Sequence, residues 1–252
     1  QLFKVRPTEP EMRNYCNEVL HFLHEFQGED LQTIKHAVRE NLEHALLKQK
    51  ERKERLIHIA EMFFVHERKE NPLSIYTHCH SSTVTEIIKK IHKKKKVILL
   101  NTETRPLFQG RKTAQEIAKE GIPVYHFIDA AMIQAIQKAD ILLVGADAIT
   151  SEGVYNKIGS ELVALVAHHL HKPLYVCASL WKYDFHHVKI EQREGKEIWE
   201  HAPLGVQMYN PVFEKIPLKY IKRIICEDGV VKPRQFFKRA QKYIRGRDYL
   251  YP

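Results

Sequence analysis

Residues 77–83 read THCHSST, so a thiol lies between two imidazoles and is followed by three hydroxyls at the end of an apolar run. A helical pattern follows. Helix amides and the helix dipole stabilise a nearby thiolate, which lowers the thiol pKa. We therefore expect Cys79 to be reactive, although a buried, inert cysteine is the commonest fate of a free thiol. His78 and His80 alternate with Cys79 along a strand, so a metal site built from all three is not expected.

Three hydroxyl side chains follow directly, Ser81, Ser82 and Thr83. At the start of a helix, hydroxyls and free backbone amides together form a phosphate-binding site. The alternative is that they only cap the helix.

The segment GADAIT (145–150) places Asp147 directly after an apolar strand. Partial burial would raise the pKa of this carboxyl and suit it to act as a general acid, whereas capping of the following turn is the alternative. Asn156 and Lys157 open a predicted helix nine residues later. An amide and an ammonium group there could hold a phosphate or a sugar hydroxyl, although a lysine at a helix start usually faces solvent.

Three further polar positions lie near predicted strand ends. Glu103 and Arg105 are expected to form a structural ion pair. Gln109, in a predicted loop, could bind a substrate hydroxyl, and Lys182 follows the fifth strand and would add positive charge.

These positions depend on two kinds of region. Residues 13–68 carry a helical apolar pattern in three series, interrupted by QGED at 27–30, and predict a helical N-terminal domain over 1–70. Residues 71–252 alternate short apolar strands with helices, which predicts a Rossmann-like α/β domain whose parallel sheet has helices on both faces. The predicted strands are 74–78, 97–103, 124–128, 141–146, 173–179 and 223–227. The predicted helices are 82–92, 112–120, 130–138, 157–171 and 233–244.

The order of elements predicts where ligands bind. In open α/β sheets they bind beyond the carboxyl ends of the strands. The residues that follow the predicted strands are a thiol, a hydroxyl and four carboxylates: Cys79, Glu103, Asp129, Asp147, Ser179 and Glu227. We therefore expect them to meet at one edge of the sheet.

Composition restricts the class of protein. The 252 residues carry a net charge of +9, with 44% apolar and 28% charged residues, and no apolar stretch is long enough to span a bilayer. The four cysteines form no CxxC pair, so we expect neither disulfides nor a zinc site, and a cytoplasmic location. The basic run KKIHKKKK (89–96) has no interleaved aromatic residues, so nucleic acid is an unlikely partner and small phosphorylated ligands are favoured.

Several ordered motifs resemble one superfamily. They are RPT (6–8), THCHSS, ETRPLFQG, GIPVYHFIDAA, GADAI, NKIG and NPVFEKIPLKYIKRIICEDG, and they run over nearly the whole chain. The superfamily joins methylthioribose-1-phosphate isomerases, archaeal ribose-1,5-bisphosphate isomerases and the regulatory subunits of eukaryotic translation initiation factor 2B. The HCHSS and WKYDF segments look most like the ribose-1,5-bisphosphate enzymes.

The resemblance implies roles for particular residues. Cys79, as a thiolate, would take the proton from C2 of the sugar, and Asp147, as a neutral acid, would protonate the ring oxygen and later C1. No metal or organic cofactor would be needed. The residues implied to contact a phosphorylated pentose are Arg6, Ser81, Ser82, Thr83, Gln109, Asn156, Lys157 and Lys182. The family's isomerases also carry an Arg- and Gly-rich phosphate-binding segment upstream of the RPT motif, which would precede Gln1.

Three functions follow from the resemblance. The first is isomerisation of ribose 1,5-bisphosphate to ribulose 1,5-bisphosphate, in nucleotide salvage. The second is a non-catalytic regulatory subunit that binds a sugar phosphate or nucleotide and a protein partner. The third is methylthioribose-1-phosphate isomerisation, which needs an apolar pocket in place of the second phosphate site. The regulatory subunits generally lack the Cys–Asp pair, so an enzyme is favoured. The resemblance also implies a homo-oligomer, at least a dimer.

Overall fold

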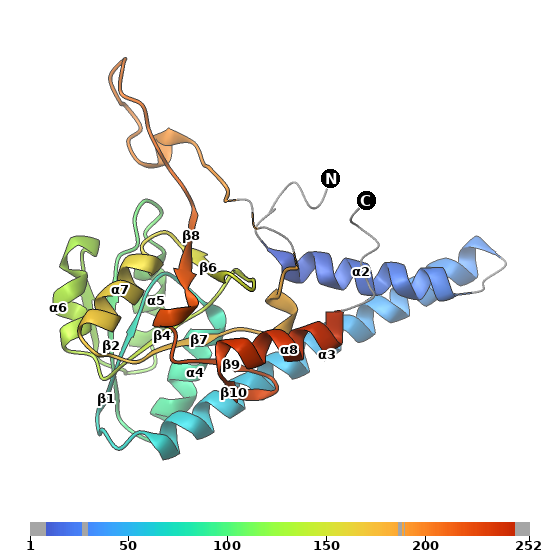
Figure 1. The fold of residues 1–252 in the computed structure, drawn as a ribbon, viewed down its shortest axis with the longest axis horizontal. Coiled ribbons are helices and arrows are strands. Elements are labelled where there is room, and N and C mark those ends of the chain that lie inside the picture. Colours follow the sequence, from blue (N-terminus) through green and yellow to red (C-terminus); the bar gives the residue numbers. More distant parts are fainter. Residues whose placement is uncertain (1–8, 27–29, 186–187, 189, 245–252) are drawn as a thin grey trace.

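A seven-stranded sheet forms the centre of the computed structural model, which describes residues 9–26, 30–185, 188 and 190–244 (Figure 1). Its strand order is β10-β9-β7-β4-β1-β2-β3, and every neighbouring pair is parallel except β9 with β10. The strands are β1 (Leu73–Thr77), β2 (Val97–Thr102), β3 (Val124–Phe127), β4 (Ile141–Val144), β7 (Leu174–Cys177), β9 (Arg223–Cys226) and β10 (Gly229–Val231).

Both faces of this sheet are buried, as its uninterrupted apolar strands require. In β4, Ile141 and Leu143 pack into one core cluster, whereas Leu142 and Val144 pack into the other. The second half of α3, with α4 and α5, contributes to the first cluster; α6, α7 and α8 contribute to the second. These helices are α3 (Leu31–Glu67), α4 (Ser82–His92), α5 (Gln109–Ala118), α6 (Met132–Gln137), α7 (Ser160–His169) and α8 (Pro233–Ile244).

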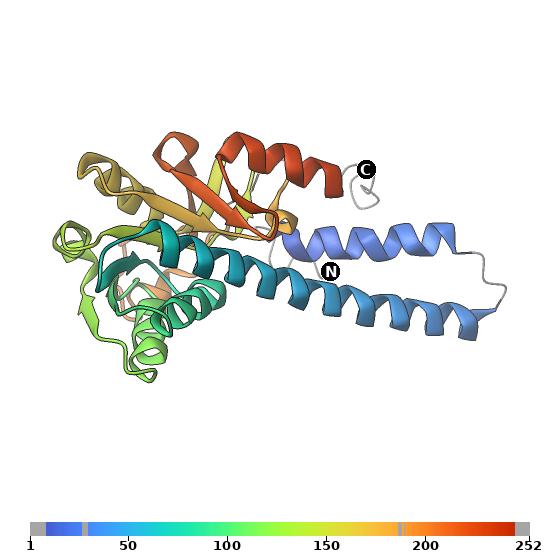
Figure 2. The ribbon, with the colours of Figure 1, turned by 90° about the horizontal axis from the view of Figure 1, so that it is seen from below.

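Two long helices make up the N-terminal region. α2 (Pro10–Glu25) and the first half of α3 lie side by side and project beyond the α/β part (Figure 2). Asp30 caps α3 by accepting hydrogen bonds from the amides of Gln32 and Thr33. α2 is anchored to the α/β part because Asn14 Nδ2 donates to the carbonyls of Trp181 and Tyr183, at 2.7 and 3.0 Å.

A second, smaller sheet was not predicted. It contains β5 (Ala148–Ile149), β6 (Gly153–Lys157) and β8 (Phe213–Pro217), all antiparallel. Its signal in the sequence is the turn SEG (151–153) between two short apolar segments, which is a hairpin pattern. The short 3₁₀ helices are η1 (Asp129–Ala131), η2 (Leu180–Lys182), η3 (Gly195–Glu197) and η4 (Leu218–Tyr220).

The predicted fold class is confirmed, with three differences in detail. The second and third apolar series of the N-terminal region belong to one 37-residue helix, α3. β10 extends the main sheet in the antiparallel direction. The domain boundary at residue 70 stays a prediction: α3 ends at Glu67, yet its Leu56, Ile57, Ala60 and Phe64 pack into the core of the main sheet. In the described part of the chain no helix, not even α3, is both long and apolar enough to cross a membrane.

The strand order reverses between β1 and β4. From β1 the chain moves to β2 and β3 on one side, then returns to β4, β7 and β9 on the other. The loops that leave β1 and β4 therefore diverge, and a crevice opens at the carboxyl ends of these two strands. Cys79 follows β1 and Asp147 follows β4, so both lie at this switch point.

Candidate functional site

A cavity of about 460 Å³, the strand-end cavity, lies at this switch point. Nine of the ten site residues predicted from the sequence line it: Cys79, Ser81, Ser82, Thr83, Gln109, Asp147, Asn156, Lys157 and Lys182. The tenth, Arg6, lies outside the described residues. The structure thus brings together residues from five separate segments, while their chemical roles stay predictions.

The backbone of Cys79 is held in an unusual conformation. Its φ is 66°, in the left-handed region, which costs a non-glycine residue about 1–3 kcal/mol. Two threonines fix it: the amide of Cys79 donates to Thr104 Oγ1 at 3.0 Å, and Thr113 Oγ1 donates to its carbonyl at 2.8 Å. Strain of this kind persists where the surroundings determine the conformation, and it is common at functional sites.

The expected low pKa of the Cys79 thiol is wrong. Burial raises this pKa to about 11, and the charge of Asp147 adds to the increase, against lowering by the His80 amide and by Lys157. α4 begins only at Ser82, with Ser81 as its N-cap, and desolvation outweighs any stabilisation by the helix. In the ligand-free protein Cys79 is therefore a protonated thiol at neutral pH.

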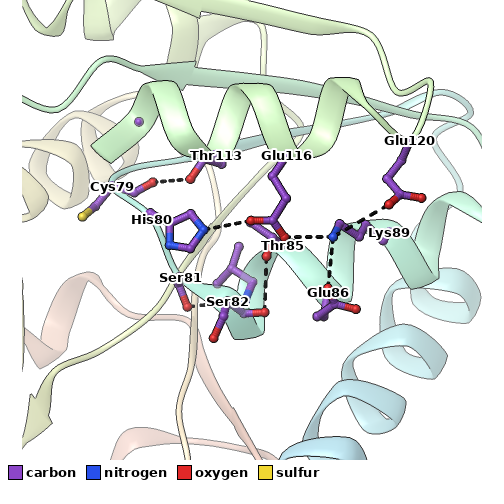
Figure 3. A network of polar contacts seen from close by, with 12 residues as sticks. Cys79, His80, Ser81, Ser82, Thr85, Glu86, Lys89, Thr113, Glu116 and Glu120 are labelled. Atoms are coloured by element: carbon purple, nitrogen blue, oxygen red, sulfur yellow. Dashed lines mark hydrogen bonds and ion pairs between the residues drawn. The ribbon is translucent and has the colours of Figure 1, made fainter. Parts of the chain in front are cut away.

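His80 belongs to a polar network that the sequence did not reveal (Figure 3). Its Nε2 lies 2.9 Å from Glu116 Oε2, and Lys89 Nζ donates to Glu116 Oε1 at 2.8 Å. Burial alone would raise the pKa of Glu116, but hydrogen bonds from Lys89, His80 and Thr85 lower it to about 2. The anionic Glu116 on α5 therefore ties α4 to the residue that follows Cys79.

His78 is a buried structural histidine rather than a ligand. Its Nε2 lies 2.8 Å from the carbonyl of Ile158, and its Nδ1 lies 3.2 Å from Thr102 Oγ1. A carbonyl can only accept, so Nε2 carries the proton and Nδ1 accepts from the threonine. Gly159 packs against this ring: its φ is +97°, and a Cβ there would lie 2.8 Å from Nε2. The histidine thereby positions the loop that follows Lys157.

The prediction that Asn156 and Lys157 open a helix is wrong. They end β6, and α7 begins at Ser160. Lys157 is only 3% exposed, burial lowers its pKa, and no hydrogen bond or ion pair joins its ammonium group to any residue that the structure describes. Asn156 is 6% exposed, and its Nδ2 likewise lacks a hydrogen-bond partner within the described residues.

Such groups are costly to bury. A buried amide without a partner, and still more a buried cation without one, destabilises the folded protein. Both side chains line the strand-end cavity, as does Gln109, whose buried Oε1 also has no partner in the described part. Two unused donors and one unused acceptor therefore line the same cavity, as expected for a site that binds a polar, anionic ligand.

Gln109 reaches this cavity because α5 starts earlier than predicted. The predicted loop position is the first residue of the helix. Gly110 allows the close approach: a Cβ there would lie 1.8 Å from the carbonyl oxygen of Thr102, so any side chain would push α5 away from β2. Asn101 Nδ2 donates to the carbonyl of Gly110 at 2.7 Å and fixes the contact.

The hydroxyl residues and Lys182 have both structural and cavity-facing roles. Ser81 Oγ accepts from the Val84 amide at 3.4 Å, so the capping alternative holds for this residue, which also lines the cavity. Lys182 lies in η2, donates to the carbonyl of Ala146 at 2.7 Å, and lies 3.8 Å from the Glu11 carboxylate.

Four of the six strand-end groups do not line the strand-end cavity: Ser179, which lines a neighbouring cavity, and the carboxylates Glu103, Asp129 and Glu227. Glu103 pairs with Arg111 at 3.0 Å rather than with Arg105, so the predicted pairing is wrong. Asp129 accepts from the amides of Thr104 and Arg105 at 2.8 and 2.7 Å. Glu227 accepts from Ser179 Oγ at 3.0 Å and from the Leu180 amide. These carboxylates fix backbone and neighbouring side chains instead.

Sequence reasoning missed two cations of the cavity, Lys112 and Arg193. Lys112 follows Gln109 by three residues, a spacing that places both on one face of α5 and could have been recognised. Arg193 comes from the segment 190–212, which extends away from the body before β8 (orange in Figure 1) and has no periodic pattern. Among the residues that the structure describes, no group of three or more His, Cys, Asp or Glu side chains could hold a metal ion.

Comparison with known proteins places this geometry in context. The model of the initiation factor 2 subunit family matches residues 1–233. The ribose 1,5-bisphosphate isomerase of Archaeoglobus fulgidus is 33% identical over 245 residues, covering 94% of this chain and 75% of that protein. A methylthioribose-1-phosphate isomerase of Desulforamulus reducens is 39% identical over 182 residues, covering 63% of this chain and 53% of that protein.

Solved structures agree with the fold. The crystal structure of the Pyrococcus horikoshii OT3 translation initiation factor eIF-2B superposes with a TM-score of 0.77 at 29% identity. The match covers 92% of this chain and 79% of that one.

Proposed function

Because the chain belongs to the initiation factor 2 subunit family, we propose that it is an aldose–ketose isomerase that converts ribose 1,5-bisphosphate to ribulose 1,5-bisphosphate. The observation that carries the proposal is that the buried Lys157 and the side-chain amide nitrogen of Asn156 have no partner among the described residues, in the cavity lined by Cys79 and Asp147. A phosphorylated sugar would supply the anion and the hydroxyls that these groups lack. The isomerase names of the most similar curated relatives support this choice of reaction.

The reaction requires a ring opening and a proton shift. Asp147, as the neutral acid, protonates the ring oxygen while the bond from C1 to that oxygen breaks. Cys79, as the thiolate, removes the proton from C2, which gives an enol between C1 and C2. Asp147 then accepts the proton of the 2-hydroxyl and delivers a proton to C1. Transfer of a proton from the Cys79 thiol to the Asp147 carboxylate restores both groups, and the phosphates stay in place.

The surrounding cations would stabilise the negative charge of the substrate and of the intermediates. Lys157 is held in a site with little water, where its charge acts strongly on an enolate-like oxygen. Lys112 and Arg193 line the same cavity and would neutralise the phosphate on C1. Lys157 also lowers the pKa of the Cys79 thiol, so the cation that binds the substrate favours the reactive thiolate.

Proton NMR of the purified protein with ribose 1,5-bisphosphate tests the proposal directly. Ketose formation is expected, with a rate loss of at least about a thousandfold in Cys79→Ser and in Asp147→Asn. Cys16→Ser is the matched control, because Cys16 is a partly buried free thiol on α2, away from this cavity. Turnover that survives in Cys79→Ser would contradict the assigned roles.

Two alternatives have support of their own. The structural match to a translation initiation factor supports a non-catalytic regulatory subunit, which predicts sugar phosphate binding without turnover and indifference to Cys79→Ser. The similarity to methylthioribose-1-phosphate isomerases supports that substrate instead. The same NMR assay with methylthioribose 1-phosphate separates the two isomerases, and failure of both substrates to react would favour the regulatory subunit.

We extend the proposal to location and assembly. The four cysteines are free thiols, which supports a reducing compartment such as the cytoplasm. Ile133 on α6 and Leu162 and Leu165 on α7 are about half exposed on neighbouring helices, which supports a homo-oligomer formed through the α/β part. Light scattering of the purified protein measures the oligomeric state, and a monomer at micromolar concentration would contradict this extension.

A further inference from the structure

A second cavity adjoins the first. This cavity, called the α3 cavity here, has a volume of about 410 Å³ and lies between α3 and the carboxyl ends of β4 and β7. It shares five lining residues with the strand-end cavity: Ser81, Ser82, Thr83, Ala146 and Lys182. The two cavities are therefore neighbours separated by the start of α4 and the side chain of Lys182.

The α3 cavity is cationic. Lys50 and Lys53 are three residues apart on α3, so they project from one face of the helix toward the sheet. Lys53 Nζ donates to Ser82 Oγ at 3.1 Å and retains two further donors. Lys182 of η2 also lines the cavity, and Glu11 is the one acidic side chain in the lining.

Lys50 is the least engaged of these cations. Within the residues that the structure describes, no hydrogen bond or ion pair involves its ammonium group. Lys182 is positioned by the carbonyl of Ala146 and by Glu11. Three lysines from two separate elements thus face a cavity whose other polar groups are neutral hydroxyls and one amide, apart from Glu11.

We propose that the α3 cavity binds the phosphate on C5 of the sugar, with Lys53 and Lys50 as residues that determine specificity for a bisphosphate. This inference rests on the proposed function. Cys79 and Asp147 act on C2, C1 and the ring oxygen, so the phosphate on C1 must stay in the strand-end cavity. C5 lies on the other side of the ring oxygen, and its phosphate extends out of that cavity into the adjoining one.

As a consequence, α3 contributes to substrate specificity. The phosphate on C5 would take the place of the Lys53 contact with Ser82 and bridge the two elements. A substrate with an uncharged group on C5 would leave Lys50 and Lys53 without an anion, and it would bind more weakly. The reacting atoms do not touch either lysine, so both act on affinity rather than on the chemical step.

Calorimetric titration compares ribose 1,5-bisphosphate with ribose 1-phosphate, in a Cys79→Ser background that prevents turnover. We expect Lys53→Met to weaken binding of the bisphosphate at least about tenfold, the size of one charge-assisted hydrogen bond, and to leave the monophosphate within about twofold. Lys50→Met should give a smaller loss of the same kind, and Lys53→Arg should restore most of the affinity. Lys48→Met is the matched control, since Lys48 is on the same helix but lines neither cavity.

Each outcome decides the inference. Equal weakening of both ligands by Lys53→Met, or no weakening of either, would overturn it, as would equal affinity of the parent protein for the two ligands. Selective loss of bisphosphate binding would establish the inference, whether or not the protein with Cys79 intact turns the bisphosphate over. Absence of turnover would refute the isomerase proposal alone. Melting temperatures of all variants show whether a loss of affinity is caused by unfolding. If Lys53→Met is unfolded, the affinity of Lys53→Arg for the two ligands decides the inference.

Discussion

Two groups of polar side chains differ in how they are satisfied: carboxylates that follow strands of the main sheet, and residues at the end of β6 in the smaller sheet. Asp129, after β3, accepts two backbone hydrogen bonds, and Glu227, after β9, accepts from Ser179 and Leu180. Asn156 and Lys157 line the strand-end cavity at the switch point between β1 and β4 and are 6% and 3% exposed, with their side-chain donors unused within the described residues.

This difference in hydrogen bonding distinguishes residues that stabilise the fold from residues that are available to a ligand. A polar group that is fully hydrogen-bonded within the protein stabilises the fold and needs no ligand. A buried group left without a partner costs stability, and its presence indicates that a ligand completes it. Burial and polarity alone do not distinguish the two groups, because Glu227 and Asn156 are each 6% exposed. Replacing a member of each group should therefore give opposite results.

The largest effect is expected for Lys157→Met, which removes the charge and keeps most of the apolar stem. Affinity for ribose 1,5-bisphosphate should fall by about tenfold to a hundredfold, because the charged contact to an anionic oxygen is lost. The melting temperature of the ligand-free protein should stay the same or rise, since an unpaired buried cation is removed. Calorimetry and thermal denaturation measure the two quantities.

Lys138→Met serves as the control, because this lysine is exposed at the end of α6. It should change neither quantity. A marked loss of stability in Lys157→Met would show that Lys157 belongs with the structural group.

A smaller effect concerns pH. Because burial raises the pKa of the Cys79 thiol to about 11, the thiolate fraction increases about tenfold for each pH unit below that value. The rate at which iodoacetamide alkylates Cys79 in the ligand-free protein should therefore increase about tenfold per pH unit from about pH 7.5, because the thiolate is the nucleophile. The increase should become less steep when Lys157, whose own pKa burial lowers, loses the charge that lowers the thiol pKa.

Mass spectrometry of Cys79 after timed alkylation at constant ionic strength measures this profile. Since Lys157 lowers the pKa of the thiol, Lys157→Met should move the increase to higher pH. An alkylation rate that is flat between about pH 7.5 and 9 would contradict the raised pKa of the Cys79 thiol.

The smallest effect on ligand binding is expected for Asp129→Ala. Two backbone amides, of Thr104 and Arg105, lose their acceptor, which should lower the free energy of unfolding by about 1–3 kcal/mol. Affinity for the bisphosphate, measured well below the melting temperature, should change less than about threefold. Urea denaturation measures the free energy of unfolding, and calorimetry measures the affinity. A large loss of affinity with unchanged stability would place Asp129 in the ligand site and contradict its assignment to the structural group.

Much of the fold could be predicted from local patterns. The uninterrupted apolar strands and the intervening helices indicated a parallel sheet covered on both faces, and α4 was predicted with the bounds that the structure shows. β5 and β6 were missed because they have only two and five residues, and the pairing of β6 with β8 joins segments about sixty residues apart. Consequently Asn156 and Lys157 were assigned to a helix, although their proximity to Asp147 was predicted.

Within the site, the sequence predicted which residues lie there better than it predicted their charge states. The position of Cys79 after a predicted strand indicated its place at the carboxyl-end edge of the sheet, but the predicted direction of its pKa shift was wrong. Desolvation depends on contacts with distant segments: Thr104 and Thr113 hold the backbone of Cys79, and Asp147 and Lys157 act on its thiol. Neighbouring residues in the chain do not reveal these contacts. Arg193 and Lys53 were missed for a related reason, since each reaches its cavity from a segment without a catalytic motif.

The sequence by itself determined the alternation of strands and helices and the order of the strand-end residues, because hydrophobic periodicity and turn residues act over short distances. Only the tertiary structure decided which of those residues have partners. It placed Glu103, Asp129 and Glu227 against donors of the framework and left Lys157 and Asn156 facing a cavity. The physical reason is that burial and hydrogen bonding depend on contacts between segments far apart in the chain, and these contacts set both the charge state and the availability of each group.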